Sequence, residues 1–386
     1  MKKLFLIAHL YLGLAGSIFL LAISLSGAVI AFEPELNRFA YPQLTTLYPT
    51  GAAVNWDNVR AQVEAQSPGW KVIRFYFPDD PMESTYLRLR SEADHRIRHI
   101  YVNQYTGQVL GSTEDGSNWI IKIHDLHVNF LSGKLGNTIV TVACYNLAVL
   151  SITGIVIWWP RKMFWPRAGR STVATTRDMH ASIGFWSFGF MFLFSVTGLG
   201  LHYQTGKLLK LLNPPTRPHA VVRRPTAAGY GHGTSIEGML QSAREALPGA
   251  ATPRLLLSER PGEPVFIYQR FPEDKTPAGR SFTTIDPQTG AVLNVGSSRT
   301  APWAETALVQ WTREIHTGTI LGLPTRLLAV FCSLLLAALT LTGPLVWLGR
   351  LRAKAKGRRI LRQRNRSLHQ ANLPELQHVP GSQPLE

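Results

Sequence analysis

The chain has 386 residues, of which 45% are hydrophobic and 17% charged, and its formal net charge is +16. Soluble proteins carry roughly a quarter charged residues, so this composition indicates a membrane protein and argues against a wholly soluble one. The two cysteines are too few to hold an iron–sulfur cluster, which takes about four thiolates. Both lie in apolar runs, so we expect no disulfide framework.

Four uncharged apolar runs follow one another along the chain, at residues 4–32, 135–159, 181–203 and 327–348. Each reaches the ~20 residues that cross ~30 Å of hydrocarbon. The first run follows Lys2 and Lys3, as a signal peptide would, but it is longer than the ~7–15 apolar residues of a cleaved signal. The sequence therefore predicts four transmembrane helices, within residues 1–32, 135–159, 181–203 and 324–348.

The basic residues are concentrated in three of the segments that flank these helices. Residues 1–3, 160–180 and 349–386 together hold 16 Lys and Arg but only three acidic residues. The positive-inside rule then places both termini and the middle loop in the cytoplasm, where the basic tail attracts anionic membrane lipid. This concentration beside the membrane argues against a nucleic-acid partner. We expect a multi-pass protein of the bacterial inner membrane.

Two large loops, 33–134 and 204–323, are then left on the periplasmic side. Alternating stretches such as KVIRFYF and EPVFIYQRF predict half-exposed strands. YVNQYTGQVL and TIDPQTGAVL each indicate a strand, a glycine turn and a second strand. Helices are expected near 55–66 and 235–246. The predicted fold class is a membrane α-helical protein, with four transmembrane helices and two periplasmic α+β domains.

The two halves of the chain repeat each other in the spacing of histidine and glycine. In each half one histidine precedes a glycine by 18 residues, and a second histidine precedes another glycine by 27. These pairs are His9 and Gly27, His180 and Gly198, His127 and Gly154, and His316 and Gly343. Such parallel repeats bring two halves together about an axis normal to the membrane, so the sequence predicts an internal two-fold repeat.

The order of these motifs resembles the PepSY-associated transmembrane helix family. HLYLG and HASIG open the first helix of each half, TG.VL recurs in both large loops, and GIVIWWPRK closes the second span. The resemblance covers about residues 1–350. It implies PepSY-like loop domains, and it is closest to the inner-membrane reductases of siderophore uptake, the ferrioxamine reductase type, which carry haem.

Six histidines lie at or near the predicted helix ends, namely His9, His124, His127, His180, His202 and His316. A lone histidine at such a place is more often a hydrogen-bonded helix end, but repeated positions can converge on the axis. We expect His9 to face His180 near the cytoplasmic side and His127 to face His316 near the periplasmic side. Two opposed imidazoles are what a six-coordinate haem iron requires, so the sequence predicts two b-type haems.

Several assignments stay open at this point. The periplasmic ligands are a choice among His127, His316 and His202, with His124 as an alternate ligand or a supporting residue. Arg313 is a candidate partner for a haem propionate, because arginine pairs well with carboxylates. The small residues that share a helix face with His9 and His180 allow either close helix contact or a porphyrin face. Zinc or copper would also accept imidazole.

The predicted function is a di-haem reductase that passes electrons across the membrane to a ferric siderophore in the periplasm. The cytoplasmic segments are too short to fold a flavin or nicotinamide domain, so the electrons would come from a quinol or a cytoplasmic protein. No catalytic residue is assigned. Two alternatives remain, a PepSY-type periplasmic binding or regulatory protein without enzymatic activity, and a transporter of the iron complex.

Overall fold

The computed structural model describes residues 2–51, 54–114, 117–160, 162–167, 171–202, 234–258, 260, 263–277, 279–301 and 311–371. The start of the second predicted loop domain, 204–233, and the end of the basic tail, 372–386, lie outside these residues. Among the described residues, four helices are long and apolar enough to cross a membrane. They are α1 (Lys2–Ile30), α6 (Gly133–Trp158), α7 (Thr172–His202) and α12 (Leu323–Ala371).

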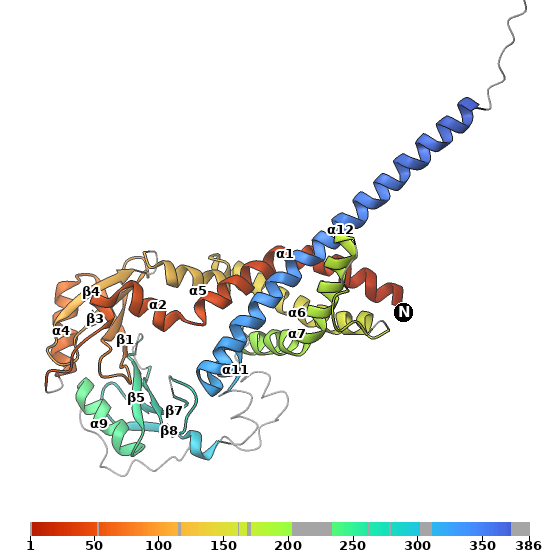
Figure 1. Ribbon diagram of the computed structural model, residues 1–386. Helices are drawn as coiled ribbons and strands as arrows, with labels where there is room; N and C mark the ends of the chain where they lie inside the picture. Colours follow the sequence, from red (N-terminus) through yellow and green to blue (C-terminus); the bar gives the residue numbers. More distant parts are fainter. Residues whose placement is uncertain are drawn as a thin grey trace, which may run out of the picture.

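These four helices form one bundle, in which α1 packs on α6 and α12, and α7 packs on the same two helices. The N-terminus and the far end of α12 lie at one end of the bundle, which we call the terminus side, and a sheet lies at the other, the sheet side (Figure 1). The middle of the bundle holds an apolar cluster of Leu20, Ala143, Leu147, Met191, Cys332 and Leu336. Both cysteines are free, and Cys332 is a packing residue of this cluster.

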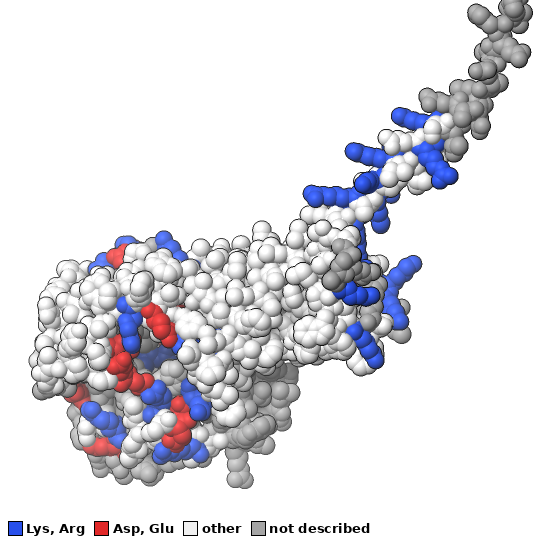
Figure 2. All heavy atoms as spheres, viewed as in Figure 1, with Lys and Arg blue, Asp and Glu red and all other residues white. Residues whose placement is uncertain are grey.

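Two helices extend beyond the predicted spans. Helix α7 begins at Thr172, inside the segment 160–180 that the sequence assigns to a loop. Helix α12 continues through the basic segment as far as Ala371, because Ala, Leu, Arg, Lys and Gln are all strong helix formers. Residues 350–367 of this extension are exposed, and Figure 2 shows basic side chains along it.

The strands of both large loops form one antiparallel sheet of eight strands, ordered β4-β3-β2-β1-β5-β6-β7-β8. The first four are β1 (Trp70–Tyr76), β2 (Thr85–Ser91), β3 (Ile97–Val102) and β4 (Val109–Glu114), and the others are β5 (Ala251–Leu256), β6 (Val265–Arg270), β7 (Ser281–Ile285) and β8 (Val292–Gly296). The two predicted α+β units therefore share one continuous sheet, to which each contributes four consecutive strands. Strands β1 and β5 pair because each would otherwise leave an edge of unpaired backbone groups.

Two helices cover one face of this sheet, α4 (Trp56–Gln66) from the first loop and α9 (Ile236–Ala246) from the second. The core beneath them includes Val63, Phe75, Leu87, Leu255 and Ile267, all 0% exposed.

The N-termini of α4 and α9 also cap each other. Asp57 accepts a hydrogen bond from the backbone N–H of Ile236 at 2.8 Å, and Glu237 accepts one from the N–H of Trp56 at 3.0 Å. Acidic groups at a helix N-terminus satisfy free N–H donors and complement the helix dipole. This exchange ties the two loops together on the covered face, as the β1–β5 pairing does within the sheet.

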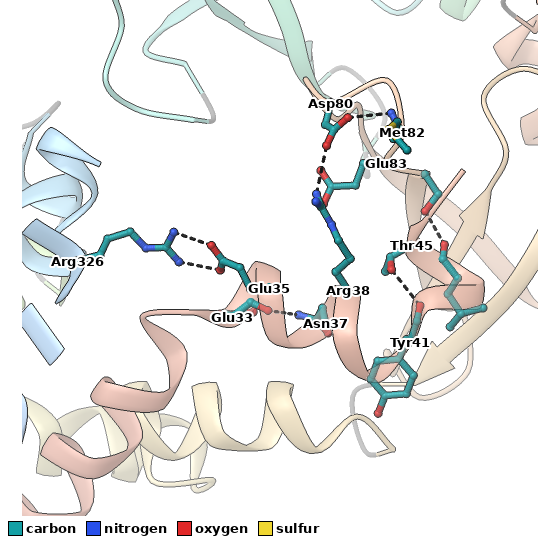
Figure 3. Close-up of polar contacts among 12 residues, drawn as sticks. Glu33, Glu35, Asn37, Arg38, Tyr41, Thr45, Asp80, Met82, Glu83 and Arg326 are labelled. Atoms are coloured by element: carbon teal, nitrogen blue, oxygen red, sulfur yellow. Dashed lines mark hydrogen bonds and ion pairs between the residues drawn. The ribbon is translucent and has the colours of Figure 1, made fainter. Parts of the chain in front are cut away.

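Short helices join the bundle to the sheet, namely α2 (Glu33–Ala40), α3 (Pro42–Thr45), α5 (Trp119–Asn129) and α11 (Thr312–Thr317). Helix α2 is fixed in two directions (Figure 3). Glu35 accepts two hydrogen bonds from Arg326 of α12, at 2.6 and 2.7 Å. Arg38 donates to Asp80 and Glu83 in the β1–β2 connection, at 3.4 and 3.2 Å. These contacts set where the sheet lies relative to the bundle.

Candidate functional site

Two histidine side chains face each other at the terminus side of the bundle. His9 of α1 and His180 of α7 have ring centroids 6.3 Å apart, with the rings inclined at 80°. The Nδ1 atom of His9 lies 2.8 Å from Oγ1 of Thr153 on α6, and Nδ1 of His180 lies 2.9 Å from Oγ1 of Thr342 on α12. Each ring is therefore held by a threonine of a neighbouring helix.

A second pair faces each other at the sheet side. His127 of α5 and His316 of α11 have ring centroids 6.2 Å apart, inclined at 57°. Nδ1 of His127 lies 2.9 Å from the backbone oxygen of Ile23 on α1, and Nδ1 of His316 lies 2.9 Å from Oγ1 of Thr197 on α7. The four histidines that the sequence pairs by its repeat are thus the four that the structure brings together.

The hydrogen bonds assign the tautomer of each ring. The threonine hydroxyls donate to carbonyls of their own helices, as Thr153 does to Val149 at 2.7 Å and Thr342 to Ala338 at 2.8 Å. Their oxygens therefore accept from Nδ1–H, and the Ile23 carbonyl can only accept. Nδ1 carries the proton in this arrangement, which leaves a lone pair on Nε2. A hydrogen bond of this kind orients a metal-ligating histidine and raises its basicity.

Each imidazole also lies against a glycine of the helix that holds it. A Cβ added at Gly27 would lie only 2.8 Å from Cε1 of His127, while at Gly154, Gly198 and Gly343 it would lie 3.3, 3.4 and 3.5 Å from Cε1 of the corresponding ring. The residue before each of these glycines hydrogen-bonds Nδ1 of the same ring, Ser26 at 3.3 Å for His127 and a threonine in the other three cases. Each ring therefore lies against a Ser–Gly or Thr–Gly dipeptide, whose hydroxyl bonds Nδ1 and whose glycine leaves room for the ring. We call this dipeptide the seat of the ring.

Other small residues in the same spans serve helix packing. A Cβ at Gly16 would collide with Nδ2 of Asn146 on α6, and those at Gly13 and Gly184 would touch Leu150 and Leu339. These three glycines allow close helix contact.

The spacing within both pairs fits one metal ion between two imidazoles. Two metal–nitrogen bonds of about 2 Å, added to two ring radii of about 1.1 Å, place the centroids about 6 Å apart. Only two protein ligands are supplied at each place, and within the described ranges no group of three or more His, Cys, Asp or Glu is arranged to hold a metal. A structural zinc site needs about four such ligands, whereas a haem iron takes two axial ligands from the protein. The donor set fits haem.

The two pairs lie at opposite ends of the bundle. His9 and Gly27, the glycine under His127, are 18 residues apart on α1, which corresponds to about 27 Å along the helix. This approaches the ~30 Å of a bilayer's hydrocarbon core. The apolar cluster around Leu20 and Met191 fills the space between them.

The other predicted site residues lie outside the two ring pairs. His124 bonds through Nδ1 to Glu33 of α2 at 2.8 Å, and this hydrogen bond raises the pKa of His124. His202 is exposed as the last residue of α7. Arg313 lies one turn before His316 on α11, with its side chain 51% exposed and 3.9 Å from the buried Glu314.

The charge state of the sheet-side pair suits metal binding. Burial lowers the pKa of His127 to about 4 and that of His316 to about 3. Both rings are therefore neutral near pH 7, and neutral imidazole is the form that binds a metal.

Sequence reasoning missed the groups that hold the rings. The repeated dipeptides SG and TG, at Ser26, Thr153, Thr197 and Thr342, are the signal that could have identified them. Each hydroxyl precedes a glycine of the repeat, so the pattern marks both halves of the seat.

Fold and site together define a multi-pass membrane protein whose loops share one sheet and whose bundle holds one facing imidazole pair at each end. The family model of the PepSY-associated TM region matches residues 6–350. The chain belongs to this family, which confirms the resemblance at the level of the family. The comparison with curated proteins finds no match.

Proposed function

We propose that this protein is a di-haem reductase of the bacterial inner membrane, which carries electrons from the cytoplasmic side to a ferric siderophore on the periplasmic side. The observation that carries the proposal is the pair of facing imidazole sites, with centroids 6.3 and 6.2 Å apart at opposite ends of one bundle. In each ring Nδ1 is hydrogen-bonded, so Nε2 is the atom that would bind the iron.

His9 and His180 would hold the cytoplasmic-side haem, and His127 and His316 the periplasmic-side haem. A bound haem supplies one-electron redox chemistry. The chain contributes the fixed orientation of each imidazole, the apolar packing that separates the two sites, and a sheet above the second pair. Arg313 stays a candidate partner for a propionate of the periplasmic-side haem.

The direction of transfer follows from charge. The terminus side carries the basic segments, so the positive-inside rule assigns it to the cytoplasm and the sheet to the periplasm. A quinol or a cytoplasmic protein would supply the electrons. Reduction of ferric iron weakens its binding by hard oxygen ligands, which suits a protein that releases iron from a siderophore.

The test is a redox titration of the pure protein in detergent. The oxidised protein should show a haem Soret band that shifts on reduction with dithionite, and a ferric siderophore added without oxygen should restore the oxidised spectrum. A colourless protein would favour the binding or regulatory alternative. A coloured protein that no ferric siderophore reoxidises would contradict the proposed substrate while retaining the haem sites.

A further inference from the structure

One face of the sheet is rich in arginine and tyrosine. Along each strand, every second side chain belongs to the buried core, and the side chains between them point away from α4 and α9. The register aligns these outward side chains across neighbouring strands. One row runs Tyr101, Tyr86, Tyr76, Arg254 and Tyr268, and the next row places Arg74 opposite Arg88. We call these seven residues the arginine–tyrosine face. It lies where the strands of the two large loops meet.

Stacking contacts fix the orientation of several side chains of this face. The rings of Tyr76 and Tyr86 stack at 4.3 Å and 12°. The guanidinium of Arg254 lies over the ring of Tyr268 at 4.2 Å. A guanidinium is planar, with a fork of N–H donors that matches a carboxylate, and stacking on an aromatic ring fixes the orientation of that plane.

The positive charge of this face has no carboxylate partner among the described residues. No ion pair there includes Arg74, Arg88 or Arg254, and the Nε atoms of Arg88 and Arg254 are buried without a hydrogen-bond partner. Arg74 and Arg88 are direct cross-strand partners, and like charges in that position are destabilising. Such an arrangement is expected where an anion supplies the missing acceptors.

Arg280 and Glu33 link the arginine–tyrosine face electrostatically to both helices that carry the sheet-side histidines. The Nε atom of Arg280 is also buried without a hydrogen-bond partner. The pKa of Arg280 is affected by Arg254 and Tyr268 on the sheet, and also by Arg313 and Glu314 on α11.

At the other end of the row, Tyr86 and Tyr101 lie within electrostatic range of Glu33. Glu33 bonds His124 on α5, the helix of His127. Glu33 and Glu314 are thus two of the acids at the margins of the face. Figure 2 shows a hollow rimmed by charged side chains between the sheet region and the bundle.

We propose that the arginine–tyrosine face binds the substrate chelate, and that this chelate is an anion with free carboxylates. The proposal rests on the reductase function proposed above and adds the charge class of the substrate. Arg88 and Arg254 would donate to its carboxylates, while the tyrosine rings would contact its apolar parts. The arginines of the face would also attract anions to the sheet side of the bundle.

The test measures binding without reduction, on the full chain in detergent, with gallium(III) in place of iron. Two hydroxamate chelates of opposite charge are compared by calorimetry, gallium aerobactin as the anion and gallium desferrioxamine B as the cation. We expect the anion to bind at least about ten-fold more tightly. Arg254→Gln and Arg88→Gln should each weaken its binding about ten-fold, as for the loss of a charge-assisted hydrogen bond.

Arg60→Gln is the matched control, because Arg60 lies on α4 at the opposite face and pairs with Glu64 at 3.3 Å. It should leave the affinity unchanged, with circular dichroism confirming the fold of every variant. Equal binding of both chelates would overturn the proposal. Folded Arg88→Gln and Arg254→Gln proteins that bind the anion normally would also overturn it. Variants that lose haem but still bind the anion would overturn it as well, because the arginines would then hold haem propionates. If the protein holds no haem but binds the anionic gallium chelate as expected, the reductase function is contradicted and this inference is retained.

Discussion

The two histidine pairs have the same local design but different surroundings. His9 and His180 project from long membrane-spanning helices, whereas His127 and His316 lie on helices of 11 and 6 residues between the bundle and the sheet. The first pair depends on bundle packing alone. The second also depends on how the short helices are anchored, and it lies at the sheet side of the bundle. The difference suits one site that receives electrons through the bundle end and another that meets a substrate.

The largest effect is expected from removing a ligand. His180→Ala should abolish electron transfer and lower the haem content from about two per chain to about one, because one axial ligand of the terminus-side site is lost. His124→Ala is the control and should keep both haems, since His124 bonds Glu33 and belongs to neither ring pair. Haem content is measured by pyridine haemochrome absorbance. Equal loss in both variants would contradict the assignment.

A glycine pair tests the difference between the two sites sterically. Gly27→Ala should displace His127 and empty the sheet-side site, because the added Cβ would lie 2.8 Å from the ring. Gly343→Ala should be tolerated, because its Cβ would meet His180 at 3.5 Å, an ordinary van der Waals contact. Haem content and the dithionite difference spectrum separate the outcomes. If both variants bind haem equally, the distance from the added Cβ to the histidine ring does not decide haem binding.

The hydroxyl should matter more where its hydrogen bond to Nδ1 is shorter, 2.9 Å for Thr342 and His180 against 3.3 Å for Ser26 and His127. Thr342→Val removes the hydroxyl that accepts from His180 and should weaken haem binding about 10–100-fold and shift the midpoint potential. Ser26→Ala should have a smaller effect, because Nδ1 of His127 keeps its 2.9 Å bond to the Ile23 carbonyl. A potentiometric titration of both variants checks this order. The reverse order would show that the Ile23 carbonyl does not hold His127, and an unchanged Thr342→Val protein would show that the hydroxyl does not hold His180.

The smallest effect is expected at the contact that anchors the sheet side. The hydrogen bonds from Arg326 lower the pKa of Glu35, so this contact stabilises the fold above the usual pKa of glutamate and loses its contribution as the pH falls through the lowered value. Glu35→Gln should therefore reduce the melting temperature by a few degrees at pH 7, in line with the ~1 kcal/mol or less of an exposed pair. The difference from the wild type should vanish in acid. A difference that persists there would exclude an electrostatic cause.

Much of this architecture follows from local patterns. Hydropathy predicts the four spanning helices because crossing a bilayer requires length and apolarity within one segment. The 18- and 27-residue spacings pair His9 with His180 and His127 with His316, because equivalent positions in a repeat meet on its axis.

Other features depend on contacts between distant segments. The β1–β5 pairing joins residues near 75 and 255, and neither strand's alternation predicts which edge it will meet. His124 is separated from Glu33 by 91 positions, so its ion pair could not be told from a ligand role. Each histidine ring lies against a glycine of another helix, as His9 does against Gly154 and His127 against Gly27. This pairing depends on how the helices pack, so the sequence does not predict it.

The most direct measurement is the ratio of haem to polypeptide in the pure wild-type protein, from pyridine haemochrome absorbance and quantitative amino-acid analysis. An imidazole pair at each end of the bundle predicts about two b-type haems per chain. A ratio of one would leave one of the pairs as a structural contact, and a ratio of zero would contradict the redox account entirely.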